Sequence, residues 1–222
     1  MSERTVRLAV DDVTLDATLG VPANAFGAVL FAHGSGSSRH SPRNRYVAGV
    51  LQSAGCATLL LDLLTRDEEA VDVATAHLRF DIGLLAGRLA GATDAARREP
   101  ELRELAIGYF GASTGAAAAL VAAAGRSDVA AIVSRGGRPD LAGPALPRVM
   151  APTLLIVGSD DRDVLTLNEA ALTRLRVEAH LAVVPGATHL FEEPGALEEV
   201  AALARDWFEQ HLRAARSARR AS

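Results

Sequence analysis

Hydrophobic and polar residues alternate at the start of the chain and then give way to unbroken apolar runs. The alternation over residues 5–10 and 13–21 is typical of half-buried strands, and Asp11-Asp12 between them is a turn signal, so we expect an N-terminal hairpin. The later runs are apolar throughout, which is the pattern of strands buried on both faces. These runs cover residues 27–34, 56–64, 105–111, 129–134, 153–158 and 179–184.

Segments with helical periodicity separate the apolar runs. They cover residues 42–55, 80–100, 115–126, 164–175 and 196–212. Strand and helix in alternation predict an α/β fold, in which helices flank both faces of a mostly parallel sheet of about eight strands. The N-terminal hairpin then adds antiparallel strands at one edge of this sheet.

The length of the chain is enough for one hydrophobic core. It has 222 residues, of which 49% are hydrophobic. We therefore expect a single domain over residues 1–222, with the basic stretch 213–222 as a frayed continuation of the last helix. The Gly- and Pro-rich stretch 135–152 is expected to be irregular and is too short for an inserted domain.

Charge and composition exclude several classes of function. The net charge of −4 disfavours binding to a long nucleic acid. All 23 basic residues are arginine, which excludes Schiff-base chemistry and the lysine of a phosphate-binding P-loop. No apolar run reaches the roughly 18 residues of a membrane span. The charged N-terminal segment and the single Cys56 favour a cytoplasmic location.

The candidate nucleophile is Ser113. Ligands of an open parallel sheet bind beyond the carboxyl ends of its strands, and polar residues follow most of the apolar runs. Gly111-Ala112-Ser113-Thr114-Gly115 fits the G-x-S-x-G turn that lifts a serine hydroxyl above the sheet. The match is specific only in context, and here an apolar run precedes it and a helical segment follows.

A serine nucleophile needs a base and an acid later in the chain. His189 follows the last expected strand on a loop that contains glycine, which suits a base. His77 and His211 are expected on helix surfaces, His180 begins a strand, and His40 lies in a polar loop. We choose Asp161 as the acid and keep Asp160 as the alternative, whereas Asp163 is expected to cap the helix that begins near Val164.

The backbone amides of Thr114 and Ser35 are the expected oxyanion hole, and Ser35 lies in the stretch "FAHGSGSS". The same stretch could indicate a dinucleotide-binding turn. Arg39 stands where that motif needs its third glycine, which counts against a nicotinamide- or flavin-dependent oxidoreductase. No cofactor and no metal are expected.

Four stretches in order, "FAHGSGSS", "GASTG", "IVGSDDRDV" and "PGATHLF", resemble α/β-hydrolases of the dienelactone-hydrolase-like group. The chain also resembles the hydrolase domain that some proteins carry fused to a phosphoribosyltransferase, although no such second domain is expected within these residues. The resemblance implies Ser113 as nucleophile, Asp161 as acid and His189 as base. Dienelactone hydrolases proper carry cysteine at the nucleophile position, so the serine here favours ester chemistry in general.

The expected activity is hydrolysis of small ester, thioester or lactone substrates through an acyl-enzyme. A non-catalytic or regulatory binding module on the same fold, or an acyltransferase, are the alternatives. The stretch 135–152 leaves no room for a lid, so we expect an open site. A planar guanidinium suits a carboxylate or phosphate, so the small-molecule substrate could be anionic, unless ion pairs with Asp62 and Asp140 occupy these arginines. The arginines concerned are Arg39, Arg43, Arg135 and Arg138.

Overall fold

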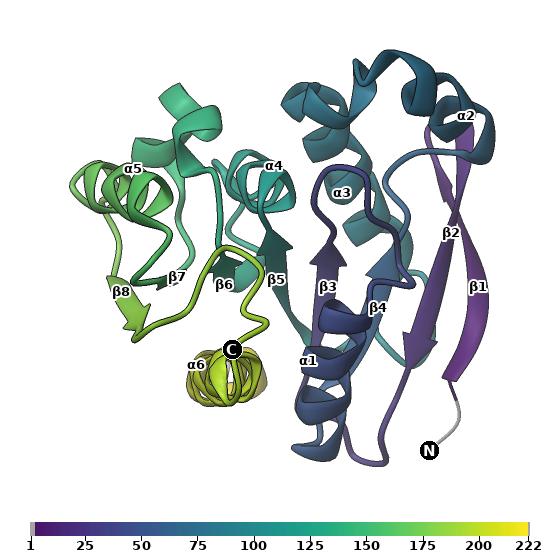
Figure 1. Cartoon of the computed structure of the whole chain (residues 1–222). Coiled ribbons are helices and arrows are strands. Elements are labelled where there is room, and N and C mark those ends of the chain that lie inside the picture. The colour runs from purple at the N-terminus through teal and green to yellow at the C-terminus, as the bar shows by residue number, and fades with distance from the viewer. Residues whose placement is uncertain (1–2, 222) are drawn as a thin grey trace.

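The chain folds around one twisted sheet, which the computed structural model describes over residues 3–221 (Figure 1). In those residues eight strands lie in the order β1-β2-β4-β3-β5-β6-β7-β8. The pairs β1·β2 and β2·β4 are antiparallel and the rest are parallel, which confirms the predicted fold class. The strands are β1 (Glu3–Val10), β2 (Val13–Gly20), β3 (Gly27–Ala32), β4 (Ala57–Leu61), β5 (Ala106–Ala112), β6 (Val129–Arg135), β7 (Thr153–Gly158) and β8 (Ala179–Val184).

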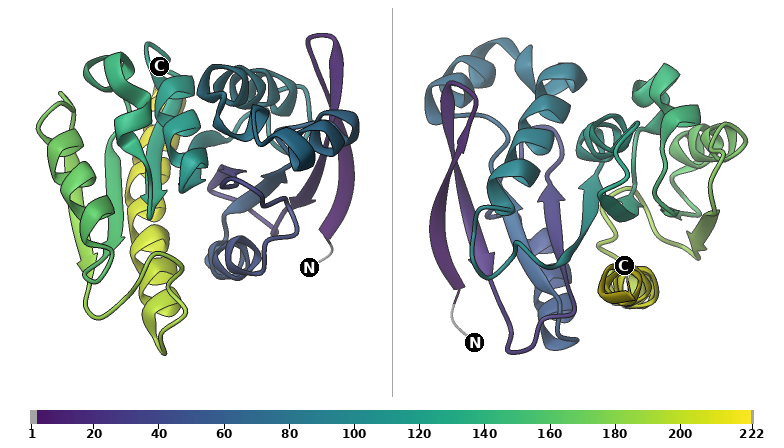
Figure 2. Two further views of the ribbon diagram at one scale, coloured as in Figure 1. Left: turned by 45° about the horizontal axis from the view of Figure 1, so that its top comes forward. Right: turned by 180° about the vertical axis from the view of Figure 1, so that it is seen from behind.

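Helices cover both faces of the sheet, as Figures 1 and 2 show. Helices α1 and α6 pack on one face, and α3, α4 and α5 pack on the other. The α-helices are α1 (Pro42–Ser53), α2 (Arg66–Thr75), α3 (Ile82–Ala96), α4 (Thr114–Ala123), α5 (Arg162–Leu172) and α6 (Ala196–Ala221). Two 3₁₀ segments are η1 (Leu78–Phe80) and η2 (Pro139–Arg148). No helix in the described part of the chain is both long and apolar enough to cross a membrane.

Two segments differ from the expectation. Helix α2 was not predicted, because its sequence is mostly polar and carries no clear apolar stripe. Its start was readable nonetheless: Thr65 accepts from the Glu68 amide at 3.2 Å, and Glu68 accepts from the Thr65 amide at 2.7 Å, which is a capping box. The stretch 135–152 is not wholly irregular, since η2 forms within it around a kink at Gly143.

The C-terminal helix α6 continues through the basic stretch to Ala221. The Arg213 guanidinium lies 4.3 Å from the centroid of the Phe26 ring, and Arg216 donates to the Ala25 carbonyl at 3.0 Å. These contacts fix part of the basic stretch against the loop before β3. The single-domain organisation and the fraying of the helix end stay predictions, and Ser222 lies outside the described residues.

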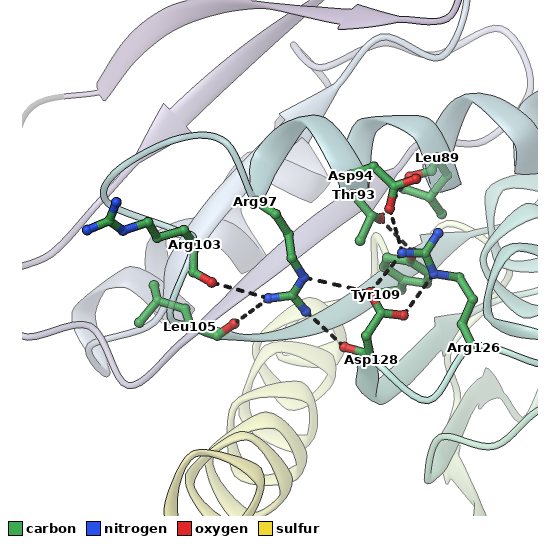
Figure 3. Close-up of polar contacts among 9 residues, drawn as sticks. All are labelled: Leu89, Thr93, Asp94, Arg97, Arg103, Leu105, Tyr109, Arg126 and Asp128. Atoms are coloured by element: carbon green, nitrogen blue, oxygen red, sulfur yellow. Dashed lines mark hydrogen bonds and ion pairs between the residues drawn. The ribbon is translucent and has the colours of Figure 1, made fainter. Parts of the chain in front are cut away.

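Arginines and carboxylates form a network at the amino ends of β5 and β6 (Figure 3). The candidate site lies at the opposite, carboxyl ends of the strands. Arg126 forms two hydrogen bonds with the Asp128 carboxylate, at 2.8 and 2.9 Å, and a third with Asp94 at 2.7 Å. Arg97 donates to the carbonyl oxygens of Leu105 and Asp128. The network therefore joins α3 to the segments that lead into β5 and β6.

We expect Asp128→Asn to lower the free energy of unfolding by about 1 kcal/mol at pH 7, because it removes charge-assisted hydrogen bonds that are partly exposed. The Arg126 guanidinium lowers the pKa of Asp128 below its usual range. A lowered carboxyl pKa stabilises the fold above the unfolded pKa of about 3.9 and loses that effect as pH falls through the folded pKa. Urea unfolding at several pH values should show the two proteins converging in acid. Glu104→Gln, at an exposed ion pair, is the control.

Candidate active site

The pentapeptide around Ser113 forms the turn from β5 into α4. Ser113 has φ 52° and ψ −119°, a backbone conformation that residues with a side chain rarely adopt. It occupies the N-cap position of α4, but its side chain makes no capping hydrogen bond. The hydroxyl is therefore not used to cap the helix and remains available at the carboxyl edge of the sheet.

Glycines on both sides give this turn its clearance. A Cβ on Gly111 would lie 2.4 Å from Ala116 Cα, and a Cβ on Gly115 would lie 2.3 Å from the Ala32 carbonyl oxygen. Both neighbours are backbone atoms, so neither can move aside cheaply. The start of α4 consequently packs directly on the ends of β5 and β3, which brings the loop after β3 beside Ser113.

His189 and Asp161 contact each other across neighbouring loops. His189 Nδ1 lies 2.6 Å from Asp161 Oδ2. The strands that precede them, β8 and β7, are parallel neighbours, so the two loops leave the sheet side by side. Because the ionised carboxylate only accepts, it holds the proton on Nδ1 and leaves Nε2 with a free lone pair. An imidazole held in this way can act as a base.

Backbone contacts tie the acid loop to the base loop. The Asp160 amide donates to the Ala187 carbonyl at 3.0 Å, and the Gly186 amide donates to Ser159 Oγ at 2.7 Å. A Cβ on Gly158 would lie 2.1 Å from the Ala187 carbonyl oxygen, so this close approach needs glycine. The separation of the carboxylate and the imidazole is thus set by the backbone.

Gly136, directly after β6, connects the imidazole to the serine turn. Its φ is 50°, and a Cβ there would lie 3.5 Å from both Cε1 and Nδ1 of His189. The residue before it, Arg135, accepts a hydrogen bond from the Ser113 amide through its carbonyl at 3.1 Å. Ser113, Asp161 and His189 follow β5, β7 and β8, so all three lie at the carboxyl edge of the same sheet, with Gly136 after β6 between the serine turn and the imidazole.

The three aspartates that follow β7 have different surroundings in the structure. Asp160 is exposed, and its carboxylate accepts from Ser159 Oγ at 3.1 Å without touching His189. The expectation that Asp163 caps the next helix is wrong, since α5 begins at Arg162 with Asp161 at its N-cap and Asp163 lies inside the first turn. The Asp161 carbonyl starts the helix while its carboxylate contacts the imidazole, so no side-chain cap forms.

Ser35 and Thr114, the expected oxyanion hole, line the same pocket of about 330 Å³. Thr114 begins α4, where the first amides have no partner within the helix. His33 fixes the loop that carries Ser35: its Nδ1 donates to the Gly34 carbonyl at 2.9 Å, and its Nε2 accepts from the Leu63 amide at 3.3 Å. Burial lowers the pKa of His33, so the neutral ring that this pairing needs is favoured.

Sequence reasoning missed one wall of this pocket. Helix α2 and η1 contribute Glu69, Val73 and the ion pair of Asp72 with Arg79, whose Nε lies 2.6 Å from Asp72 Oδ2. Their place in the site depends on α2, which was not predicted, and the capping box at Thr65 is the signal that could have found it. Within residues 3–221 no separate domain covers this pocket, but α2 and η1 bound it on one side, so it is not as open as expected.

Three of the four candidate substrate arginines form ion pairs: Arg43 does so with Glu192 at 3.2 Å, and Arg39 and Arg138 do so with the two aspartates that the sequence suggested. The Arg39 amide donates to Asp62 Oδ1 at 2.7 Å, and its guanidinium pairs with Asp62 Oδ2. Arg138 makes two hydrogen bonds with the Asp140 carboxylate, at 2.8 and 2.7 Å. These are the ion pairs that were the alternative to substrate binding, and they neutralise both charges.

Two of the other histidines, His211 and His77, do not lie where the sequence suggested. His211 is not on the surface as expected: its side chain is 10% exposed, and its ring packs on Trp207 with centroids 4.3 Å apart. The apolar face of α6 packs on the sheet, and His211 lies next to that face rather than on the solvent side of the helix. His77 is exposed, but it lies between α2 and η1 rather than in a helix.

Comparison with solved structures shows similarity over nearly the whole chain. A dienelactone hydrolase from Anabaena variabilis is 61% identical, with 96% of this chain and 99% of that chain covered and a TM-score of 0.94. An esterase domain from a Rhodothermus marinus protein is 18% identical, with 96% and 100% covered and a TM-score of 0.73, which is a likeness of fold. No protein-family model matches the chain.

Curated relatives carry a different kind of name. Proteins from two strains of Mycobacterium tuberculosis, each named a phosphoribosyl transferase, are 56% identical over 213 residues. The match covers 96% of this chain but 47% of each relative. The chain therefore spans about half the length of these relatives.

Proposed function

The chain belongs to the dienelactone hydrolase family of α/β-hydrolases, and from this premise we propose that it is a serine hydrolase of small ester, thioester or lactone substrates. The observation that carries the proposal is the positive φ of Ser113 at the end of β5, in a structure that also brings His189 and Asp161 together. The Ser113 backbone is strained, and its hydroxyl makes no capping hydrogen bond to the helix. This combination is what a nucleophile at this position needs.

In the proposed mechanism His189 Nε2 takes the proton of Ser113 as its oxygen attacks the substrate carbonyl. Asp161 keeps the imidazole in the required tautomer and stabilises its charged form. The amides of Ser35 and Thr114 donate to the oxygen that becomes negative. The protonated His189 then gives its proton to the leaving alcohol, thiol or lactone oxygen, and an acyl group remains on Ser113.

Water completes the cycle: it attacks the acyl carbonyl while His189 takes its proton, and His189 then gives that proton to the Ser113 oxygen as the acyl–oxygen bond breaks and the carboxylic acid leaves. The side chain of His189 is 39% exposed, so water reaches the base directly. This favours hydrolysis over transfer of the acyl group to another acceptor, which would need water to be excluded.

The phosphoribosyl transferase name of the mycobacterial relatives belongs to proteins about twice as long as this chain. Any activity of such a longer protein is a separate matter from the hydrolysis proposed here. We also propose a cytoplasmic location, which is supported by the single buried Cys56 without a disulfide partner.

A fluorophosphonate probe tests the proposal, because it phosphonylates only a serine that a neighbouring base has activated. We expect the folded protein to be labelled, and mass spectrometry of its peptides to locate the adduct on Ser113. A folded protein that is not labelled would favour a non-catalytic binding module, and a label on a different serine would overturn the assignment of Ser113 as nucleophile. Heat-denatured protein is the control, since it retains every serine but loses the site.

A further inference from the structure

The loop after β3 carries Ser35, whose amide is one of the two proposed oxyanion donors. Ser35 and Gly36 at its apex are exposed, so packing does not fix them. The chain turns back there through a hydrogen bond from the Ser37 amide to the Gly34 carbonyl, at 3.2 Å. The position of the Ser35 amide relative to Ser113 therefore depends on how the two ends of this loop are held.

The first end of the loop is held at His33 and Gly34. A Cβ on Gly34 would lie 3.1 Å from both the Ala112 carbonyl oxygen and Ser113 Cβ, so the backbone here passes directly against the serine turn. His33 Nε2 accepts from the Leu63 amide at 3.3 Å. This end is thus tied to the segment that follows β4.

The second end of the loop is held by Asp62, the first residue after β4. Asp62 Oδ1 accepts from the backbone amide of Arg39 at 2.7 Å, and Oδ2 pairs with the Arg39 guanidinium. The two side chains are 15% and 13% exposed, so water competes little for this pair. A carboxylate that accepts from a main-chain amide fixes the backbone itself, and such charge-assisted bonds are strong. Asp62 and Leu63 therefore hold opposite ends of the same loop.

Asp62 is in turn fixed by the sheet. Its amide donates to the Asp16 carbonyl at 3.0 Å, which continues the antiparallel pairing of β2 with β4 by one residue. The Asp16 carboxylate also lies 3.9 Å from the Arg39 guanidinium. The anchor of the loop is thus part of a regular element, which is a more precise support than another loop would be.

We propose that Asp62 is a positioning residue, which holds the loop after β3 so that the Ser35 amide faces the oxygen that becomes negative. Asp62 lines the same pocket as Ser35 and Thr114. This rests on the proposed hydrolase function. Asp62 acts through the loop: without its carboxylate the Arg39 end is released and the amide loses its alignment. The loss falls on the transition state, because the charge on the oxygen develops only there.

A pair of esters tests the role of Asp62. Values of kcat/KM are compared for p-nitrophenyl acetate and p-nitrophenyl thionoacetate, in which sulfur replaces the carbonyl oxygen. Sulfur accepts hydrogen bonds weakly, so the ratio of the two values measures the oxyanion hole. We expect Asp62→Ala to lower kcat/KM for the acetate roughly 10-fold and the ratio of acetate to thionoacetate roughly 3- to 10-fold, since removal of a whole oxyanion donor costs about 10²- to 10³-fold.

Two further variants separate positioning from stability. Asp62→Asn keeps an oxygen that can accept from the Arg39 amide but loses the charge, so its ratio should lie between those of the wild type and Asp62→Ala. Asp128→Asn breaks a comparable arginine pair at the amino ends of β5 and β6, so it should cost stability and keep the wild-type ratio.

An unchanged ratio in Asp62→Ala, even with a lower kcat/KM, would mean that Asp62 only stabilises the fold, and it would overturn the proposal. An equal fall of the ratio in Asp128→Asn would do the same. If Asp62→Ala does not fold, the ratio in Asp62→Asn decides, and a wild-type value there contradicts the positioning role. A protein that is labelled at Ser113 and hydrolyses both esters with an unchanged ratio in the variants loses this inference alone. If neither ester is hydrolysed and Ser113 is not labelled, the hydrolase function fails with it.

Discussion

Ser113→Ala is expected to lower kcat for hydrolysis of a neutral ester by roughly 10⁵- to 10⁶-fold. The substitution removes the one oxygen that is proposed to form the acyl-enzyme. The backbone conformation stays equally strained, and no capping hydrogen bond is lost, since Ser113 makes none. The Tm should therefore change little. Burst kinetics should show that the first turnover is lost, not only the steady state.

The control for Ser113→Ala is Ser53→Ala on α1, an exposed serine whose hydroxyl donates to the Gly49 carbonyl at 2.9 Å. It should keep the wild-type kcat. A Ser113→Ala protein that is folded and retains more than about one hundredth of the wild-type kcat would contradict the nucleophile assignment, because residual rates from binding and the oxyanion hole alone are far lower.

Asp161→Asn is expected to lower kcat by roughly 10³- to 10⁴-fold. An asparagine amide at this position can donate towards Nδ1, which favours the tautomer with its proton on Nε2 and removes the lone pair that would take the serine proton. The negative charge that stabilises the protonated imidazole is lost as well. Steady-state kinetics on the same ester measure the effect.

Asp160→Asn is the matched comparison, because it makes the same chemical change one residue away on the same loop. Its carboxylate is exposed and does not touch His189, so kcat should stay within about twofold, as for most exposed substitutions. Equal losses in the two variants, or a larger loss in Asp160→Asn, would mean that the acid has been assigned to the wrong residue.

The parts of the site that depend on strand order were predictable from the sequence. Apolar runs fix which residues follow each strand, and parallel neighbours bring those residues to one edge. Once β5 and β8 are assigned, the sequence puts Ser113 and His189 at the carboxyl edge of the sheet. Asp161 was chosen with Asp160 kept as the alternative, and only the structure distinguishes the two, because the Asp161 carboxylate contacts His189 and the Asp160 carboxylate does not.

The parts that depend on side-chain partners were not predictable. Four arginines looked alike as candidates for an anion, yet three of them pair with carboxylates and Arg135 does not. Pairing is decided by where side chains meet in space. Helix α2 was missed for a related reason: it lies on the surface, buries little, and is stabilised at its start by the capping box of Thr65 and Glu68.

The φ of 52° at Ser113 means that stability and catalysis are in conflict at this one residue. Glycine adopts such a backbone angle without steric cost, whereas a side chain there costs on the order of 1 to 3 kcal/mol. If thermal stability were the only requirement, glycine would be favoured at position 113. The buried alanines of α4 and the close approach of Gly111 and Gly115 to backbone atoms hold the turn in this conformation, so the alanine-rich helix is part of what keeps the serine oxygen in place.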